Sequence, residues 1–397
     1  MRALSLTAFI ACMVIILGSH TFGYAANPAI GYMLSDSKGN LLAHQNGEVS
    51  FVPASIIKLL TGLAALDGLK PGYRFKTIYY LDPVTKDLYI KGFGDPFFVS
   101  EVIERLSLDI GSRVKSDTIR HIVCDATYFD PDITIPGKGF SLNPYDSPVG
   151  ALCANFNTIN FKWDTSAGRF ISAEPQTPLL DIFLAKIRQT GLKNGRILLS
   201  KEDSLVYPGL LIRYFLSKQM PVTGQVHLGR LPVSDHVAEV FLSPYTIERL
   251  IQKLLEFSNN FMANQLMLSL GASVYGAPAT LEKGVNAVRF YAETTLGIKN
   301  FSFIEGSGLS RKNRLTPAQM MTVLNHFQPF YSMLNRRQND FYKTGTLHGV
   351  RTRAGFLFGK DNCPFPYVIM INQNNKGYNH IYKKLVKKVN RLRCPDE

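Results

Sequence analysis

The sequence VPASIIKLLTGLAAL, at residues 52–66, predicts the central element of the fold. Pro53 stands just ahead of a helix start, apolar residues follow on nearly every face, and Gly68 supplies a stop signal. These signals predict a buried helix with Ser55 in its first turn. Because residues three apart lie on one face of a helix, Lys58 is expected beside the Ser55 hydroxyl.

Ser55 and Lys58 have the residue types of a nucleophile and its base. A serine hydroxyl is a weak nucleophile until a neighbouring base removes its proton. An ammonium group among Ile and Leu side chains loses hydration, and a second cation nearby, Lys343, also favours the neutral amine. We therefore predict Lys58 as the base for Ser55. The alternative is a surface lysine that extends its amine to solvent, which the apolar flanks disfavour.

Two further motifs follow along the chain, SNN at 258–260 and KTGT at 343–346. A Ser-x-x-Lys pattern alone is weak, since it recurs from Ser35 in a polar turn and from Ser112 in a charged stretch. Taken singly, the SNN motif predicts a helix cap and the KTGT lysine a solvated strand-edge residue. In combination with Ser55 they indicate a catalytic site.

The charge balance points to an anionic partner. The chain has 397 residues, with 44 Lys and Arg against 30 Asp and Glu, a formal net charge of +14. Nucleic acid is not expected, because the charge is scattered and zinc-finger, helix-turn-helix and aromatic-basic RNA-binding patterns are missing from the sequence. Peptidoglycan, anionic lipid or an acidic glycan suits an exported basic protein better.

The N-terminus predicts export. Residues 1–26 combine a charged start, an apolar run over 3–18 that is short for a membrane span, and small residues at a cleavage site. We therefore expect a signal peptide and an exported, periplasmic protein.

The cysteines allow several arrangements. Cys12 should leave with the signal, whereas Cys124, Cys153, Cys363 and Cys394 permit three disulfide pairings or remain as free buried thiols. Their spacing is not that of metal ligands, so we predict no metal and no cofactor.

The order of the segments predicts an α+β fold. A hairpin at 30–34 and 41–44, with strands near 341–346, 351–358 and 367–372, can form one antiparallel sheet flanked by helices. We divide the chain into a signal peptide, a catalytic domain of residues 27–96 and 241–397, and an inserted strand-rich domain of residues 97–240.

Two segments of this fold bear on binding. The KTGT motif is expected on the sheet edge, where Gly345 lets an extended peptide approach as an added strand. The basic segment 378–393 predicts either a membrane-surface helix or a helix that covers the core with its charged face in solvent.

The combined motifs of this sequence resemble those of a known family. The motifs match the pattern of penicillin-binding proteins and class A β-lactamases. The match is most specific to the low-molecular-mass, class C penicillin-binding proteins, which are D-alanyl-D-alanine carboxypeptidase/endopeptidases. The further matching strings are GDP at 94–96, NPYDSPVGAL at 143–152, NFNT at 155–158 and GSGLSR at 306–311.

The resemblance implies a serine β-lactamase/DD-peptidase-like fold and a serine peptidase that cleaves peptidoglycan stem peptides or cross-links. β-Lactams would be covalent inhibitors. Ser55 would form the acyl-enzyme and Lys58 would take its proton. Ser258 would pass a proton to the departing amine, and Asn260 would hold Lys58 and the substrate amide.

The remaining implied roles concern substrate binding. Lys343, Thr344 and Thr346 would attract the terminal carboxylate, beside Gly345. Arg311 and Asp125 correspond to positions that contact the charged side chain of the peptide stem, although Arg311 fits a surface-loop residue and Asp125 a strand-end cap equally well.

The chain departs from the family pattern at two positions. Glu305 stands where Asp is usual, and His348 stands where Gln is common, so His348 is expected to alter substrate contacts. The alternatives to a peptidase are a non-catalytic penicillin- or peptidoglycan-binding module and, less favoured, a β-lactamase. The sequence leaves the oligomeric state open.

Overall fold

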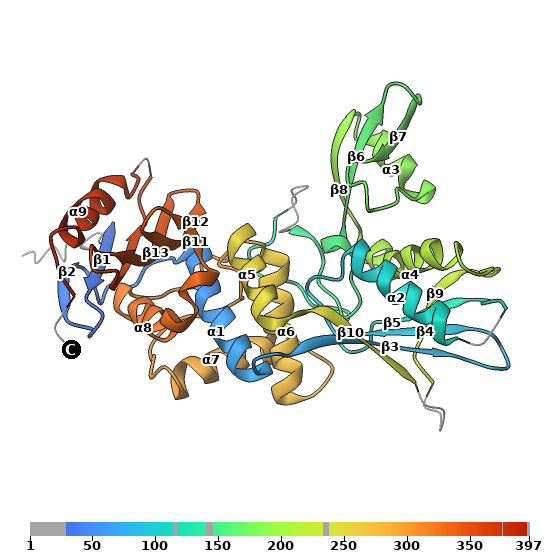
Figure 1. The fold of residues 1–397 in the computed structure, drawn as a ribbon, viewed down its shortest axis with the longest axis horizontal. Helices are drawn as coiled ribbons and strands as arrows, with labels where there is room; N and C mark the ends of the chain where they lie inside the picture. The colour runs from blue at the N-terminus through green and yellow to red at the C-terminus, as the bar shows by residue number, and fades with distance from the viewer. Residues whose placement is uncertain (1–28, 115–116, 140–145, 233–237, 375, 395–397) are drawn as a thin grey trace, which may run out of the picture.

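The computed structural model describes residues 29–114, 117–139, 146–232, 238–374 and 376–394. Its described strands form sheets of six, five and three strands, and the larger two lie toward opposite ends of an elongated molecule (Figure 1). The predicted signal peptide and residues 143–145 of the NPYDSPVGAL string lie outside the described residues.

The six-stranded sheet confirms the predicted sheet. It joins the N-terminal hairpin to the C-terminal strands in the order β11-β12-β13-β14-β1-β2, with every neighbouring pair antiparallel. The bounds are β1 Ile30–Ser35, β2 Leu41–Gln45, β11 Asn335–Arg337, β12 Asp340–Leu347, β13 Val350–Phe358 and β14 Pro364–Ile371.

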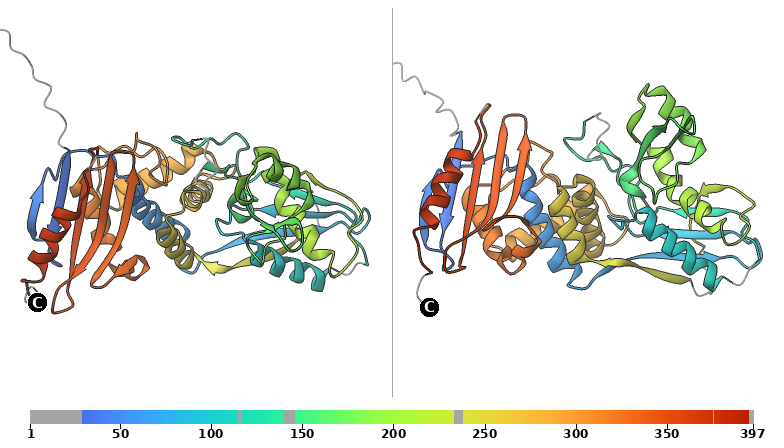
Figure 2. Two further views of the ribbon diagram at one scale, coloured as in Figure 1. Left: turned by 90° about the horizontal axis from the view of Figure 1, so that it is seen from above. Right: turned by 45° about the horizontal axis from the view of Figure 1, so that its top comes forward.

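The two faces of this sheet contact different helices. Phe356, Val368 and Met370 point into the main core, which also includes α1 (Lys58–Leu69) and α8 (Pro317–Phe327). The alternate residues Leu357 and Tyr367 face α9 (Asn379–Val389). This division follows from the period of two along a strand. Figure 2 shows α9 on the opposite side of the sheet from α1.

The C-terminal helix covers the sheet. Ile381, Leu385, Val389 and Leu392 join the apolar cluster beneath α9, and the lysines lie outside it. The structure therefore favours the second of the two sequence-based interpretations, a core-covering helix. In the part of the chain that is described, no helix has the length and apolarity needed to cross a membrane.

The predicted buried helix is confirmed with two differences. Residues Ala54–Ile57 form a separate 3-10 turn, so the α-helix itself begins at Lys58. Gly68 does not end the helix, which continues to Leu69; a β-carbon at Gly68 would overlap the Leu270 side chain. The glycine thus serves close packing against α6 rather than termination. The surrounding helices are α5 Ile247–Phe257, α6 Asn260–Tyr275 and α7 Leu281–Thr294.

The five-stranded sheet extends further toward the N-terminus than the predicted insertion of residues 97–240. Its order is β10-β3-β4-β5-β9. The strands β3 and β4, which lie ahead of residue 97, pair with β10 and β5, and β10 itself extends past residue 240. The bounds are β3 Arg74–Leu81, β4 Leu88–Gly92, β5 Ile122–Asp125, β9 Val226–Leu228 and β10 Glu239–Thr246. Strand pairing over such distances is not encoded in local sequence, so the boundary was not visible there.

The predicted insertion also contains substantial helices. The three-stranded sheet has the order β7-β6-β8, and long helices pack beside the five-stranded sheet (Figure 1). The bounds are α2 Ser100–Arg113, β6 Thr158–Asp164, β7 Arg169–Ser172, α3 Leu184–Gln189, β8 Asn194–Leu198 and α4 Lys201–Leu216. Pro208 lies within α4, where proline normally argues against a helix.

The structure contains one disulfide among the four described cysteines. Cys363 and Cys394 are bonded, with their Cα atoms 5.7 Å apart, and connect the β13–β14 loop to the chain after α9. Cys124 and Cys153 are free and buried. The cysteines are thus divided between the two arrangements that the sequence left open.

We expect Cys394→Ser to lower the free energy of unfolding by about 2–4 kcal/mol, because the unfolded chain would lose the constraint of the Cys363 cross-link. Equilibrium denaturation measures this difference. Reductant should destabilise the wild-type protein by a similar amount and leave the variant unchanged. An unchanged wild-type transition in reductant would contradict the cross-link.

Candidate active site

Ser55 and Lys58 lie together at the start of the central helix. Lys58 Nζ is 2.9 Å from Ser55 Oγ, because the 3-10 turn and the first turn of α1 place the two side chains on one face. Ser55 is partly accessible, whereas Lys58 is fully buried. A hydroxyl open to a ligand therefore faces an amine that solvent does not reach.

The Lys58 amine is held by two other segments. Nζ lies 2.6 Å from Asn260 Oδ1 and donates to the Ser307 carbonyl oxygen at 2.6 Å. Burial lowers the pKa of Lys58 well below its usual value, and the nearby Lys343 charge lowers it further, while Glu305 opposes the shift. The environment thus favours the neutral amine that a general base requires.

Ser258 lies between two helices. It follows α5 in a left-handed conformation, with φ of 53°, and Asn259 caps α6 by accepting a hydrogen bond from the Met262 N–H at 3.1 Å. The helix cap that this motif predicts is therefore formed by Asn259. The neighbouring Ser258 and Asn260 side chains remain available to the site.

The third motif contacts the second directly. Lys343 Nζ donates to Ser258 Oγ at 2.8 Å, although the two residues are 85 positions apart. Burial lowers the pKa of Lys343 from its usual value to about 8. The structure thus brings Ser55, Lys58, Ser258, Asn260 and Lys343 into one site.

The KTGT motif lies along an edge of β12 that has no strand partner among the described residues. The short β11 pairs only with residues 340–342, so residues 343–347 have no strand partner on that side among the described residues. A β-carbon at Gly345 would lie 2.7 Å from Ser55 N and 2.9 Å from Pro53 O, so only glycine lets the strand approach the Ser55 turn this closely. Thr344 is partly buried and Thr346 is exposed.

Glu305 organises a loop whose importance the sequence did not reveal. Its fully buried carboxylate accepts hydrogen bonds from the N–H groups of Ser307 (2.8 Å), Gly308 (2.8 Å) and Ser310 (3.1 Å), and from Asn313 Nδ2 (2.8 Å). These bonds fix the loop that presents the Ser307 carbonyl to Lys58. The Glu for Asp departure from the family pattern was the available signal.

The three remaining candidates are placed differently. Arg311 and His348 are exposed neighbours, and the Arg311 guanidinium donates to the His348 carbonyl oxygen beside the end of the KTGT strand. Asp125 is buried, and its carboxylate accepts from Lys91 Nζ at 3.2 Å, Thr127 N–H at 2.9 Å and Leu231 N–H at 2.9 Å. The structure favours the strand-end cap for Asp125, because these partners occupy both carboxylate oxygens.

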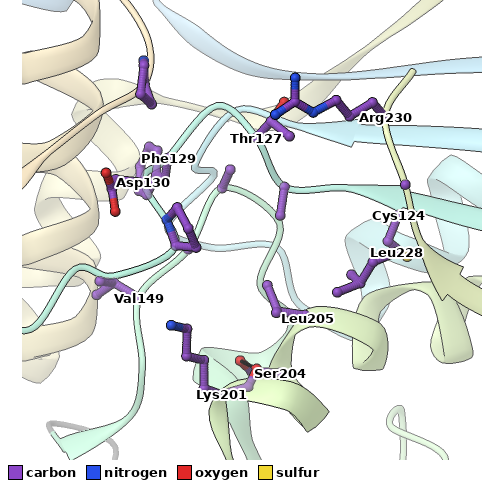
Figure 3. Close-up of a pocket in the computed structure, with 16 residues that line it drawn as sticks. Cys124, Thr127, Phe129, Asp130, Val149, Lys201, Ser204, Leu205, Leu228 and Arg230 are labelled. Carbon is purple, nitrogen blue, oxygen red and sulfur yellow. Dashed lines mark hydrogen bonds between the residues drawn. The ribbon is translucent and has the colours of Figure 1, made fainter. Parts of the chain in front are cut away.

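A cavity of about 320 Å³ lies near Asp125 (Figure 3). It is formed by the end of β5, the start of α4 and the end of β9, and includes Cys124, Ser204 and Leu228. None of the predicted site residues is among the described residues that line it. The cavity is therefore separate from the serine and lysine cluster.

Comparisons with known proteins identify two carboxypeptidases as relatives of this chain. A D-alanyl-D-alanine carboxypeptidase of Actinomadura sp. is 22% identical over an alignment of 404 positions. This alignment covers 83% of this chain and 75% of the relative. A second relative, the D-alanyl-D-alanine carboxypeptidase DacB of Haemophilus influenzae, is 25% identical over 224 residues, covering 50% of this chain and 40% of that protein.

Solved structures share the fold. Penicillin binding protein 4 from Haemophilus influenzae superposes with a TM-score of 0.73 at 19% identity, covering 90% of this chain and 96% of that one. A predatory peptidoglycan endopeptidase from Bdellovibrio bacteriovorus gives 0.56 at 16% identity, with 92% and 93% covered. The family model matches residues 25–194 and 193–336, well over half of the sequence, and the chain belongs to the D-Ala-D-Ala carboxypeptidase 3 (S13) family.

Proposed function

We propose that this protein is a serine D-Ala-D-Ala carboxypeptidase that cleaves peptidoglycan stem peptides through an acyl-enzyme on Ser55. This proposal rests on the 2.9 Å separation between Ser55 Oγ and the buried Lys58 Nζ. Family membership and the similarity to named carboxypeptidases support the substrate class.

Acylation begins when neutral Lys58 takes the Ser55 hydroxyl proton. Ser55 Oγ then bonds to the carbonyl carbon of the penultimate D-alanine, and the carbonyl oxygen becomes an oxyanion. The backbone N–H groups of Ser55 and Thr346 would receive this charge, and in a measured protease one such donor is worth about 2.7–4 kcal/mol. The close approach of Gly345 to Ser55 supports placing these two N–H groups together.

Collapse of the tetrahedral intermediate breaks the C–N bond and releases D-alanine. Ser258 passes its proton to the departing amine and regains one from Lys58, which returns the proton taken from Ser55. Lys343 keeps its charge and holds Ser258 through their hydrogen bond. Lys343, Thr344 and Thr346 attract the terminal carboxylate of the substrate. Water then attacks the ester carbonyl and the C–O bond to Ser55 breaks. The shortened peptide leaves with a new carboxylate, and Ser55 regains its hydroxyl proton.

The partners follow from the same site. The strand edge at 343–347 suits an extended peptide. β-Lactams, which are cyclic amides, would acylate Ser55 as covalent inhibitors. We place the protein outside the cytoplasm, in the periplasm, on the strength of the predicted signal peptide. Arg311 and His348 remain proposed contacts for the stem side chain, whereas the burial of Asp125 speaks against a direct contact there.

The proposal is tested by incubating the protein with a pentapeptide that ends in D-Ala-D-Ala and measuring free D-alanine. Mass analysis after penicillin treatment should map a covalent adduct to the peptide that carries Ser55. A cross-linked muropeptide dimer tests endopeptidase action in parallel. Penicillin turnover without D-alanine release would indicate a β-lactamase, and neither activity would indicate a binding module.

The pH dependence of kcat/KM is expected to be bell-shaped. Lys58 must be neutral to act as a base, so the rate should rise as the pH passes its lowered pKa. Lys343 must be charged to attract a carboxylate, so the rate should fall above its pKa of about 8. A pH series of D-alanine release measures both limbs.

Lys343→Arg supplies the matched control for this profile. Because a guanidinium stays charged at every accessible pH, the alkaline limb should disappear or move upward while the acidic limb stays in place. An alkaline limb that is unchanged in the variant would show that Lys343 does not set it.

Glu305→Gln should lower kcat/KM by about tenfold or more, because an amide nitrogen would face backbone donors and lose hydrogen bonds worth about 1.5–3 kcal/mol each. Glu305 is a positioning residue, since it acts through the Ser307 carbonyl on Lys58. The acidic limb of the pH profile should shift in this variant. A normal rate with an unshifted limb would assign Glu305 to stability alone.

A further inference from the structure

A basic groove lies on the side of the six-stranded sheet that faces away from the catalytic helices. It has a volume of about 680 Å³ and runs between α9 and the turn that joins β11 to β12. Figure 2 shows α9 separated from α1 by the sheet. Neither Ser55 nor any other proposed site residue is among the described residues that line this groove.

The walls of the groove carry unpaired positive charge. Lys383 and Lys387 lie one turn apart on the same side of α9, and Arg391 follows two residues after the helix ends. Arg337 belongs to the opposite wall. All four are exposed, and none forms an ion pair with a described residue. No acidic residue is found among its described lining residues.

Arg353 and Tyr382 line the groove and belong to a cluster, with Asp340 and Tyr342 beneath them, whose charges balance. Arg353 Nη2 lies 2.5 Å from Asp340 Oδ2, and the guanidinium stacks over the rings of Tyr342 at 3.5 Å and Tyr382 at 4.5 Å. The Tyr382 hydroxyl also donates to Asp340 at 2.8 Å. Because Arg353 compensates the Asp340 charge, the four wall cations remain as an excess.

The groove does not suit insertion of α9 into a membrane. An interfacial helix needs a free apolar face, but Ile381, Leu385 and Val389 are packed on the sheet. The positive groups instead line a concavity whose size falls within the range of about 300–1,000 Å³ that is usual for ligand sites. A compact anionic group fits this shape better than a flat lipid surface does.

The side chains of the groove walls limit the chemical class of the ligand. Guanidinium and ammonium groups are the usual protein partners of phosphate. Gln338, Asn379 and Asn390 add amides, which both donate to and accept from hydroxyl groups. We propose that this groove binds a saccharide that carries at least two phosphate groups, with the cations on the phosphates and the amides on the sugar hydroxyls.

The test uses the full mature chain and a glucosamine disaccharide with a phosphate at each end, titrated by calorimetry beside the unphosphorylated disaccharide. We expect the phosphorylated sugar alone to bind. The triple variant Lys383→Gln, Lys387→Gln, Arg391→Gln should lose at least about tenfold in affinity, since a charge-assisted hydrogen bond contributes enough for such a change. All three side chains are exposed, so folding should be preserved.

A second triple variant is the matched control. Lys162→Gln, Lys193→Gln and Lys299→Gln remove the same charge from exposed positions that lie neither in the groove lining nor on α9. Its affinity should stay within about twofold of wild type, because distant surface charges are screened by salt. Penicillin acylation of Ser55 should be equal in all three proteins, which separates this test from the proposed peptidase activity.

Several results would overturn the proposal. Absence of binding would do so, as would equal binding of the unphosphorylated sugar. Equal losses in both triple variants would assign the attraction to net charge rather than to the groove. Phosphatidylglycerol vesicles that bind as tightly as the sugar, with the same loss in the groove variant, would assign the groove to a lipid surface instead.

Discussion

Ser55→Ala is expected to abolish the penicillin adduct and to lower D-alanine release by about four to six orders of magnitude, as removal of the nucleophile does in a well-measured serine protease. The hydroxyl supplies the atom that forms the acyl bond, and no other Ser-x-x-Lys serine shares its setting. Intact-mass analysis with penicillin and a D-alanine assay give the two readouts. Retention of either activity in the variant rejects Ser55 as the nucleophile.

Ser112→Ala is the matched control for this experiment. Ser112 starts another Ser-x-x-Lys pattern, but its exposed hydroxyl donates to the Asp109 carbonyl oxygen at 2.8 Å at the end of α2. Acylation and D-alanine release should remain at wild-type levels. Thermal unfolding of both variants shows whether the fold is preserved.

Lys58→Met should lower acylation by about 10²–10⁴-fold, the usual contribution of a general base. Methionine keeps much of the buried volume but cannot accept a proton. Stopped-flow acylation with a chromogenic β-lactam measures the rate directly, separately from deacylation.

Lys58→Arg distinguishes the base from a fixed charge. Arginine stays protonated, so it should be as inactive as methionine if Lys58 acts as a neutral amine. Lys91→Met is the control, because Lys91 is a partly exposed lysine bonded to Asp125 outside the serine cluster. An arginine variant with more than about a tenth of the wild-type rate would contradict the proton transfer, which needs a titratable group.

The serine and lysine pair was visible in the sequence because its geometry is local. A separation of three residues in a helical segment brings the two side chains together regardless of the rest of the fold. The apolar neighbours of Lys58 also predicted its burial and the direction of its pKa shift, both of which the structure reproduces.

Other parts of the site depend on contacts between distant segments. Asn260 and Ser307, which contact Lys58 Nζ, lie 202 and 249 positions further along the chain. The motif order indicated that Asn260 belongs to the site. Glu305 was noted in the sequence only as a departure from the family pattern, and nothing local identified the Ser307 carbonyl or the loop that Glu305 orders. Asp125 is a residue that the sequence singled out but that the structure buries beside Lys91. This burial depends on strand pairing that the residues next to Asp125 in the sequence do not specify.

The sequence by itself determined the reactive pair, the antiparallel sheet and the motifs that share one site, because helix geometry, alternation along strands and motif chemistry act over short distances. Tertiary contacts alone established the Cys363–Cys394 disulfide, the pairing of β3 and β4 within the five-stranded sheet, the Glu305 loop and the basic groove beside α9. Each of these depends on which distant residues become neighbours, and that is settled by the packing of the whole core.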